Sequence, residues 1–183
     1  DSLSLSGLNF DSPDFQVEAS VGTSRTSGLF GEIEAHVVPE ILDHYTKESW
    51  TFEGAVTYMA EISGVLSAPV LDGVVTGDLE WTYGHKTVPK VFLFENMSGG
   101  LQLSPHDGLK LSEVTGDYAG GELVVSGAVA IDLAVEMLSL SFTRCEFDRV
   151  IGPMIGHPSP WVNFDGDATV TLSGSLRPFE LSG

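Results

Sequence analysis

Basic residues are scarce in this sequence. Its 183 residues include only 8 Lys and Arg against 26 Asp and Glu, which gives a formal net charge of −18. Nucleic acids and anionic membrane surfaces are bound through clustered Lys and Arg, so this balance argues against both as partners. Because charged residues make up only 19% of the chain, the acidity reflects a shortage of basic residues.

Cysteine and long apolar runs are also lacking. Cys145 stands alone, which excludes an internal disulfide framework and leaves a small packed side chain as its simplest role. The most apolar region, 127–142, is interrupted by Asp132 and Glu136 and falls short of a membrane span. No signal peptide is visible from Asp1 onward, so we expect either a mature protein or an excised segment of a longer one.

Motifs for catalysis and for metal binding are missing. No histidine stands at metal-ligand spacing from another, and neither a nucleophile elbow nor a phosphate-binding glycine loop is present. Asn163, Asp165 and Asp167 resemble the start of a calcium loop, but Gly166 is at the fourth position instead of the sixth. A turn at Asp165-Gly166 is the simpler interpretation. We therefore expect no enzymatic activity, no metal site and no cofactor.

Alternation of apolar and polar residues dominates what is present. The period of two that is typical of half-buried strands is clear over 15–21 and 33–37, and a first strand contains a slip at Gly7. Asp107-Gly108 predicts a tight hairpin turn, and Gly99-Gly100 is interpreted as a turn as well. Because no alternation of strands with helices is seen, the sequence predicts an all-β chain of long antiparallel strands.

The stretch 121–136 alternates most regularly. Its large aliphatic residues share one parity, and a single strand of this length would run about 45 Å. The phase changes near Met137, which predicts a tight connection or a bulge between two strands. The aliphatic face of this stretch and of its continuation is the candidate lipid-binding surface, made of Leu123, Val125, Val129, Ile131, Leu133, Leu138, Leu140 and Phe142.

A phrase of the sequence returns after a fixed interval. Ser-Gly-Val-Leu around Gly64 recurs as Ser-Gly-Ser-Leu around Gly174, an offset of 174 − 64 = 110 residues. Self-similarity at a fixed period is typical of supersecondary units that stack on one another. We interpret residues 1–183 as a single segment of a repeat-built β-groove, with one repeat at 50–160 and the start of the next at 161–183.

These phrases resemble those of TamB and AsmA-like proteins. The runs 62–73 and 172–178 are similar to the family's recurring Ser-Gly-x-Leu-x-x-Pro phrase, and 107–127 is similar to its Asp-Gly and Gly-Gly run. The resemblance implies an elongated curled sheet, described as a β-taco or half-pipe groove, that is lined with apolar side chains. It also implies one or two short helical turns, at Pro39–Tyr45 and Phe147–Ile151.

The same resemblance implies a place and a role. The family is linked to phospholipid transport between membranes and, for TamB, to outer-membrane protein assembly. It therefore implies a location in the periplasm, within a cell-envelope protein whose full length is anchored in the inner membrane. The implied partners are phospholipid or another acyl lipid, together with an outer-membrane barrel or an inner-membrane protein. The family contributes no known catalytic residues.

Two alternatives fit the same alternation. A structural or adhesin-type β-repeat would pack its aliphatic face into a dry core, because periodicity is the same for a closed core and an open groove. A lipocalin-like or barrel-cyclase protein would need a few convergent polar groups in an apolar pocket, and the sequence reveals none. The leading hypothesis is a non-enzymatic groove that holds acyl chains.

Overall fold

The strands of the protein form one continuous sheet. The computed structural model describes residues 2–26, 28–40, 50–83, 90–132, 134–146, 149, 165–176 and 179–182. Eleven antiparallel strands each pair with the next strand in the sequence, from β1 to β11. They are β1 Ser2–Asp11, β2 Phe15–Ser24, β3 Gly28–Val37, β4 Trp50–Val65, β5 Ala68–Tyr83, β6 Lys90–Ser104, β7 Gly108–Tyr118, β8 Gly121–Val129, β9 Ala134–Glu146, β10 Asp165–Leu176 and β11 Phe179–Ser182.

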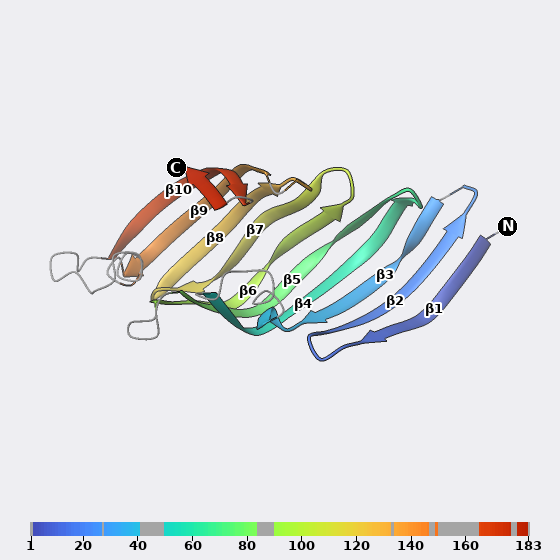
Figure 1. Cartoon of the computed structure of the whole chain (residues 1–183), viewed down its shortest axis with the longest axis horizontal. Coiled ribbons are helices and arrows are strands. Elements are labelled where there is room, and N and C mark those ends of the chain that lie inside the picture. The colour runs from blue at the N-terminus through green and yellow to red at the C-terminus, as the bar shows by residue number, and fades with distance from the viewer. Residues whose placement is uncertain are drawn as a thin grey trace.

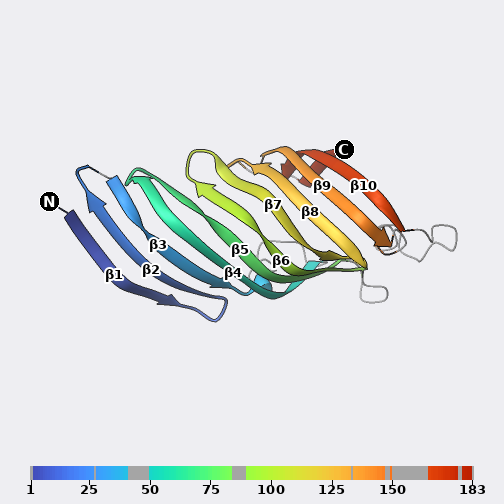
Figure 2. The same cartoon turned by 180° about the vertical axis from the view of Figure 1, so that it is seen from behind.

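The sheet is elongated and curled. The strands lie side by side along the long axis of the molecule, with β1 at one end and β10 near the other (Figure 1, and Figure 2 from behind). β1 and β11 are not paired with each other, so the sheet keeps two free edges and does not close into a ring. The predicted all-β fold of long antiparallel strands in a curled sheet is confirmed.

The register of the strands places apolar side chains on one face of the sheet and polar side chains on the other. One cross-strand row is apolar or glycine from β1 to β9, in the order Leu5, Val21, Gly31, Ile62, Leu71, Leu103, Leu109, Val129 and Val135. The row on the opposite face is mostly polar, in the order Ser20, Glu32, Glu61, Asp72, Gln102, Lys110 and Ala128. Because strand side chains alternate between faces, the sheet has one apolar face and one polar face.

Bulges keep apolar residues on one face of the sheet where the period of two in the sequence is interrupted. Asn96 and Arg144 have φ values of 52° and 54° at two register shifts. Each extra backbone N–H donates to a carboxylate of the neighbouring strand, Asn96 to Asp78 Oδ1 at 2.7 Å and Arg144 to Asp167 Oδ1 at 2.8 Å. A bulge bends its strand and increases the local twist, so these positions also contribute to the curl.

The stretch 121–136 is not the single long strand that its alternation predicts. β8 ends at Val129, the chain turns through Ile131 and Asp132, and β9 begins at Ala134. Asp132 Oδ1 accepts a hydrogen bond from the Ala134 N–H at 3.0 Å and so stabilises the turn. The large residues keep the same parity through the turn, so alternation alone does not reveal the reversal.

The phase change expected near Met137 is a bulge. Val129 pairs with Val135, whereas Ala128 pairs with Met137, which leaves one extra residue in β9. Apolar residues therefore have odd numbers up to Val135 and even numbers from Leu138 onward while staying on one face. Of the two readings of this phase change, the bulge is correct, and the chain reversal lies several residues earlier.

Two glycine-containing dipeptides interpreted as turns lie inside strands. Gly99 and Gly100 are in the middle of β6, and a Cβ on Gly99 would collide with the backbone of Val114 in β7. Asp165-Gly166 belongs to β10, paired with β9. Neither dipeptide reverses the chain, and at Gly99 a close approach of the neighbouring backbone requires glycine. The turn predicted at Asp107-Gly108 and the slip at Gly7 are confirmed.

The repeated Ser-Gly phrase occupies two hairpins, β4–β5 and β10–β11. β4–β5 closes with Val65 paired to Ala68, and β10–β11 closes with Leu176 paired to Phe179. The second turn therefore falls one residue later than the 110-residue offset would place it.

The repeat boundaries 50–160 and 161–183 stay predictions, and the helical turns expected at 39–45 and 147–151 lie almost wholly outside the described residues.

Candidate functional site: the apolar face of the sheet

The predicted binding residues can now be placed. Six of them share the apolar face, in β8 and β9: Leu123, Val125, Val129, Leu138, Leu140 and Phe142. Direct partners across the two strands include Leu123 with Phe142 and Val125 with Leu140. Ile131 lies in the β8–β9 turn with 58% of its surface exposed, and Leu133 falls outside the described residues.

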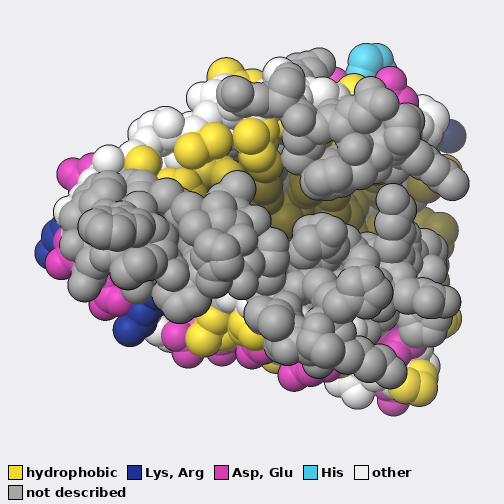
Figure 3. Space-filling model, turned by 60° about the vertical axis from the view of Figure 1, so that its left-hand side comes forward, with side chains coloured by type: hydrophobic (Ala, Val, Ile, Leu, Met, Phe, Trp, Pro, Cys, Tyr) yellow, Lys and Arg dark blue, Asp and Glu magenta, His cyan; other side chains and the backbone are white. Residues whose placement is uncertain are grey.

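The apolar face extends far beyond those two strands. Its most buried part lies in the middle of the sheet, where Val75, Val114 and Leu123 are 5%, 3% and 5% exposed. Toward the β1 edge, Leu3 and Phe10 are 65% and 59% exposed, and Val170 in β10 is 40% exposed. Because the sheet curls, the side chains of its apolar face lie closest together over the middle strands and farther apart toward β1 and β10. Figure 3 shows hydrophobic side chains along the inside of the resulting hollow, which we call the trough.

Aromatic residues concentrate along one side of the trough. Trp81 and Phe92 stack with ring centroids 5.0 Å apart, and Tyr118 and Phe142 are tilted at 5.9 Å. The Phe94 ring lies over Gly116, where a Cβ would clash with it. The prediction from sequence centred on β8 and β9, so it included Phe142 and missed Trp81, Phe92, Phe94 and Tyr118. The apolar residues of 75–83 share one parity, and this pattern could have identified the β5 part of the aromatic cluster. Its β6 part follows only when β5 and β6 are paired with the bulge at Asn96.

Two polar side chains on the apolar face, Tyr58 and Cys145, are bonded within the sheet. The Tyr58 hydroxyl donates to the Leu101 carbonyl oxygen at 3.0 Å, spanning β5. The Cys145 thiol, fully buried, donates to the Tyr118 carbonyl oxygen at 3.3 Å. Burial raises the pKa of Tyr58 and the pKa of Tyr118 to about 12, and it also raises the pKa of Cys145. These groups stay uncharged at neutral pH, so they keep the trough apolar.

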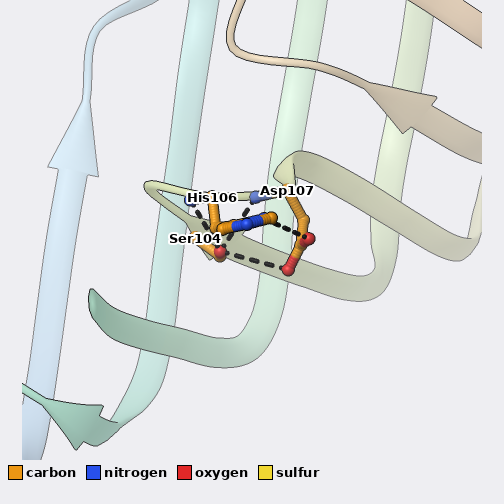
Figure 4. Close-up of polar contacts among 3 residues, drawn as sticks. All are labelled: Ser104, His106 and Asp107. Carbon is orange, nitrogen blue, oxygen red and sulfur yellow. Dashed lines mark hydrogen bonds and ion pairs between the residues drawn. The ribbon is translucent and has the colours of Figure 1, made fainter.

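A serine, a histidine and an aspartate meet in the β6–β7 turn, but not as a catalytic relay (Figure 4). Ser104 Oγ accepts hydrogen bonds from the backbone N–H groups of His106 and Asp107, each at 3.1 Å. The His106 ring bonds Asp107 Oδ1 at 3.1 Å and makes no bond to the serine hydroxyl. Nucleophile activation needs the base to hold the hydroxyl proton, so this arrangement caps a turn.

Metal ligation and membrane spanning by a helix have no support in the described residues. No group of three or more His, Cys, Asp or Glu side chains there could hold a metal ion. Asp167, from the calcium-like run, accepts the bulge N–H of Arg144, whereas Asn163 lies outside the described part. Within that part no helix is long and apolar enough to cross a membrane.

Fold and site together define a class, a curled antiparallel β-sheet with an apolar trough. Substantial contact between elements occurs only between neighbouring strands, and the described residues supply no second sheet or helix to cover the apolar face. Comparison with protein-family models, with curated proteins and with solved structures finds no match.

Proposed function

We propose that the trough holds the acyl chains of a lipid, and that this chain is a segment of a TamB/AsmA-like groove protein that moves phospholipid between membranes or serves outer-membrane assembly. One observation carries the proposal. The apolar residues of successive strands gather on one face of a single sheet, and the described strands supply no partner layer. The face is buried at its middle, whereas toward its ends Leu3, Phe10 and Val170 are 65%, 59% and 40% exposed. This exposed apolar surface favours an occupant, because its contact with water is unfavourable.

The dimensions and chemistry of the trough suit an acyl chain. The ten strands from β1 to β10 are separated by nine spacings of about 4.8 Å, so the apolar face extends for about 43 Å across the strands. Each methylene group that leaves water for an apolar surface contributes about 0.8 kcal/mol. The aliphatic rows provide this surface without directional polar groups, which favours binding by chain length over binding by shape.

The two alternatives find less support. A dry adhesin-type core requires a second packed layer, which the described residues do not provide. A lipocalin-like site requires a closed barrel with convergent polar groups, whereas β1 and β11 are unpaired with each other and the buried Tyr58 hydroxyl is already bonded to backbone. We propose a non-enzymatic role in the periplasm on the strength of the family resemblance.

Native mass spectrometry of the purified chain tests this proposal. The wild-type chain should carry phospholipid, and Val125→Asp should fold but lose it, because the carboxylate would lie on the apolar face. Val124→Asp is the matched control, since Val124 is the neighbouring residue in β8 and faces the polar side. Absence of lipid from the folded wild-type protein, or loss of lipid from both variants alike, would remove the support for an acyl-chain trough.

A further inference from the structure

A distinct cavity lies at one long edge of the trough, where the β6–β7 and β8–β9 hairpins turn. Its volume is about 430 Å³. Its inner wall consists of consecutive partners in one cross-strand row of the apolar face, Leu71, Leu103, Leu109 and Val129. Pro105 and Ile131 add one residue from each turn. The cavity is therefore continuous with the trough and reaches the turns.

The two turns that frame this cavity lie against each other. Gly108 opens β7 with a φ of 82°, and a Cβ there would collide with the Val129 carbonyl oxygen and with Ala130. Only glycine allows this approach. The turns of β6–β7 and β8–β9 thus form one shared lip.

Exposed apolar residues mark this edge of the sheet. Ile131 in the β8–β9 turn is 58% exposed, and Val65 at the end of β4 and Leu66 in the β4–β5 turn are 56% and 83% exposed. Hairpin turns are normally built from polar residues and glycine. Neighbouring apolar turn residues therefore point to contact with an apolar partner, as expected where lipid passes over an edge.

Carboxylates accompany the apolar residues on the lip. Asp107 follows Pro105 and His106 in the β6–β7 turn, and Asp132 follows Ile131 in the β8–β9 turn. Both aspartates are exposed. No Lys or Arg lines the cavity among the described residues. His106 pairs with Asp107 Oδ1 at 3.1 Å, and Lys110, the nearest Lys or Arg in sequence, belongs to the polar face of β7.

We propose that this cavity seats one acyl chain of a lipid whose headgroup carries an ammonium group and no net negative charge, as in phosphatidylethanolamine. The inference rests on the proposed function of the trough. The aliphatic wall takes the chain, and Asp107 and Asp132 attract the ammonium group while repelling an anionic headgroup. Phosphatidylglycerol, with the same chains but a net negative headgroup, is the disfavoured counterpart.

Extraction from vesicles tests the headgroup preference. Phosphatidylcholine vesicles would contain a small fraction of acyl-labelled phosphatidylethanolamine or phosphatidylglycerol, and transfer of the label to the protein would be measured. The wild-type chain should take up phosphatidylethanolamine about fivefold better, as a single close charge contact in water provides, and high salt should reduce the difference. Asp107→Asn with Asp132→Asn should abolish the preference, and Asp107→Lys with Asp132→Lys should reverse it.

Glu18→Lys with Glu53→Lys is the matched control, because it changes net charge by the same amount at exposed strand positions of the polar face. The control should keep the wild-type preference. Equal uptake of both lipids, or an equal effect of the control pair, overturns the headgroup inference while acyl binding stands. Failure of the folded wild-type chain to take up any acyl-labelled lipid, labelled phosphatidylcholine included, overturns the proposed function itself.

Discussion

Removing one large apolar side chain from each face of β6 should reveal the two-sided character of the sheet. Phe94 belongs to the apolar face, where it is 5% exposed and lies over Gly116. Its neighbour Leu93 pairs with Glu80 on the polar face and is 41% exposed. Phe94→Ala and Leu93→Ala therefore compare the two faces at adjacent positions of one strand.

The expected costs differ severalfold. Replacing a buried Phe by Ala costs about 3–5 kcal/mol when the cavity cannot collapse. A sheet without a second layer can relax around the gap, so we expect about 3 kcal/mol for Phe94→Ala. Leu93 has less apolar surface to lose, and a half-exposed leucine of this kind should cost about 1 kcal/mol.

Urea unfolding followed by circular dichroism measures both free energies. The slope of the transition should be the same for both variants, since neither changes the extent of the sheet. A cost for Leu93→Ala equal to that for Phe94→Ala would refute the assignment of a buried apolar face and an exposed polar face.

Three further predictions follow from the polar face, the tyrosines and the bulges. Glu32, Glu61 and Asp72 are direct cross-strand partners, so raising ionic strength should raise Tm, and an unchanged Tm would contradict their repulsion. Tyr58 and Tyr118 have pKa values of about 12 in the folded protein, above the value of about 10 in an unfolded chain. Their contribution to the free energy of unfolding should therefore be full below pH 10 and be lost as the pH rises to 12. Thermal melts of Tyr58→Phe with Tyr118→Phe should show a smaller fall in stability over this pH range. Asp78→Ala leaves the Asn96 N–H without its 2.7 Å acceptor and should cost about 1 kcal/mol in urea unfolding. Asp72→Ala should cost nothing, because it removes only a long 3.4 Å bond from the exposed Gln102 side chain and relieves repulsion from Glu61.

Much of the fold could be predicted from alternation alone. The period of two in 15–21 and 33–37 directly reports strands with one apolar face, and β2 and β3 pair over these residues. Glycine was the weaker guide, because it serves both turns and close strand packing. Gly99-Gly100 resembles a turn in sequence but allows β6 to approach β7, and only the pairing distinguishes the two roles.

The candidate site was predicted only in part, because alternation identifies the face of a residue within a strand but does not show where the strand ends. Leu123, Val125 and Leu140 share a face because parity and register agree there. Ile131 was misplaced because the β8–β9 turn preserves parity, so its apolar residue continues the pattern of the strand. The aromatic side of the trough depends on the Asn96 bulge and on pairing between β5 and β6, which are non-local features that a single sequence does not encode in a readable pattern.

Photo-crosslinking tests the central claim, that acyl chains lie along the apolar face, most directly. Phosphatidylethanolamine with a diazirine on its acyl chain would be bound to the wild-type protein and irradiated, and adducts would be mapped by peptide mass spectrometry. The account predicts adducts at Val125, Leu140 and Val170 on the apolar face. Adducts confined to Val124 and Met137 on the polar face, or spread equally over both faces, would contradict it.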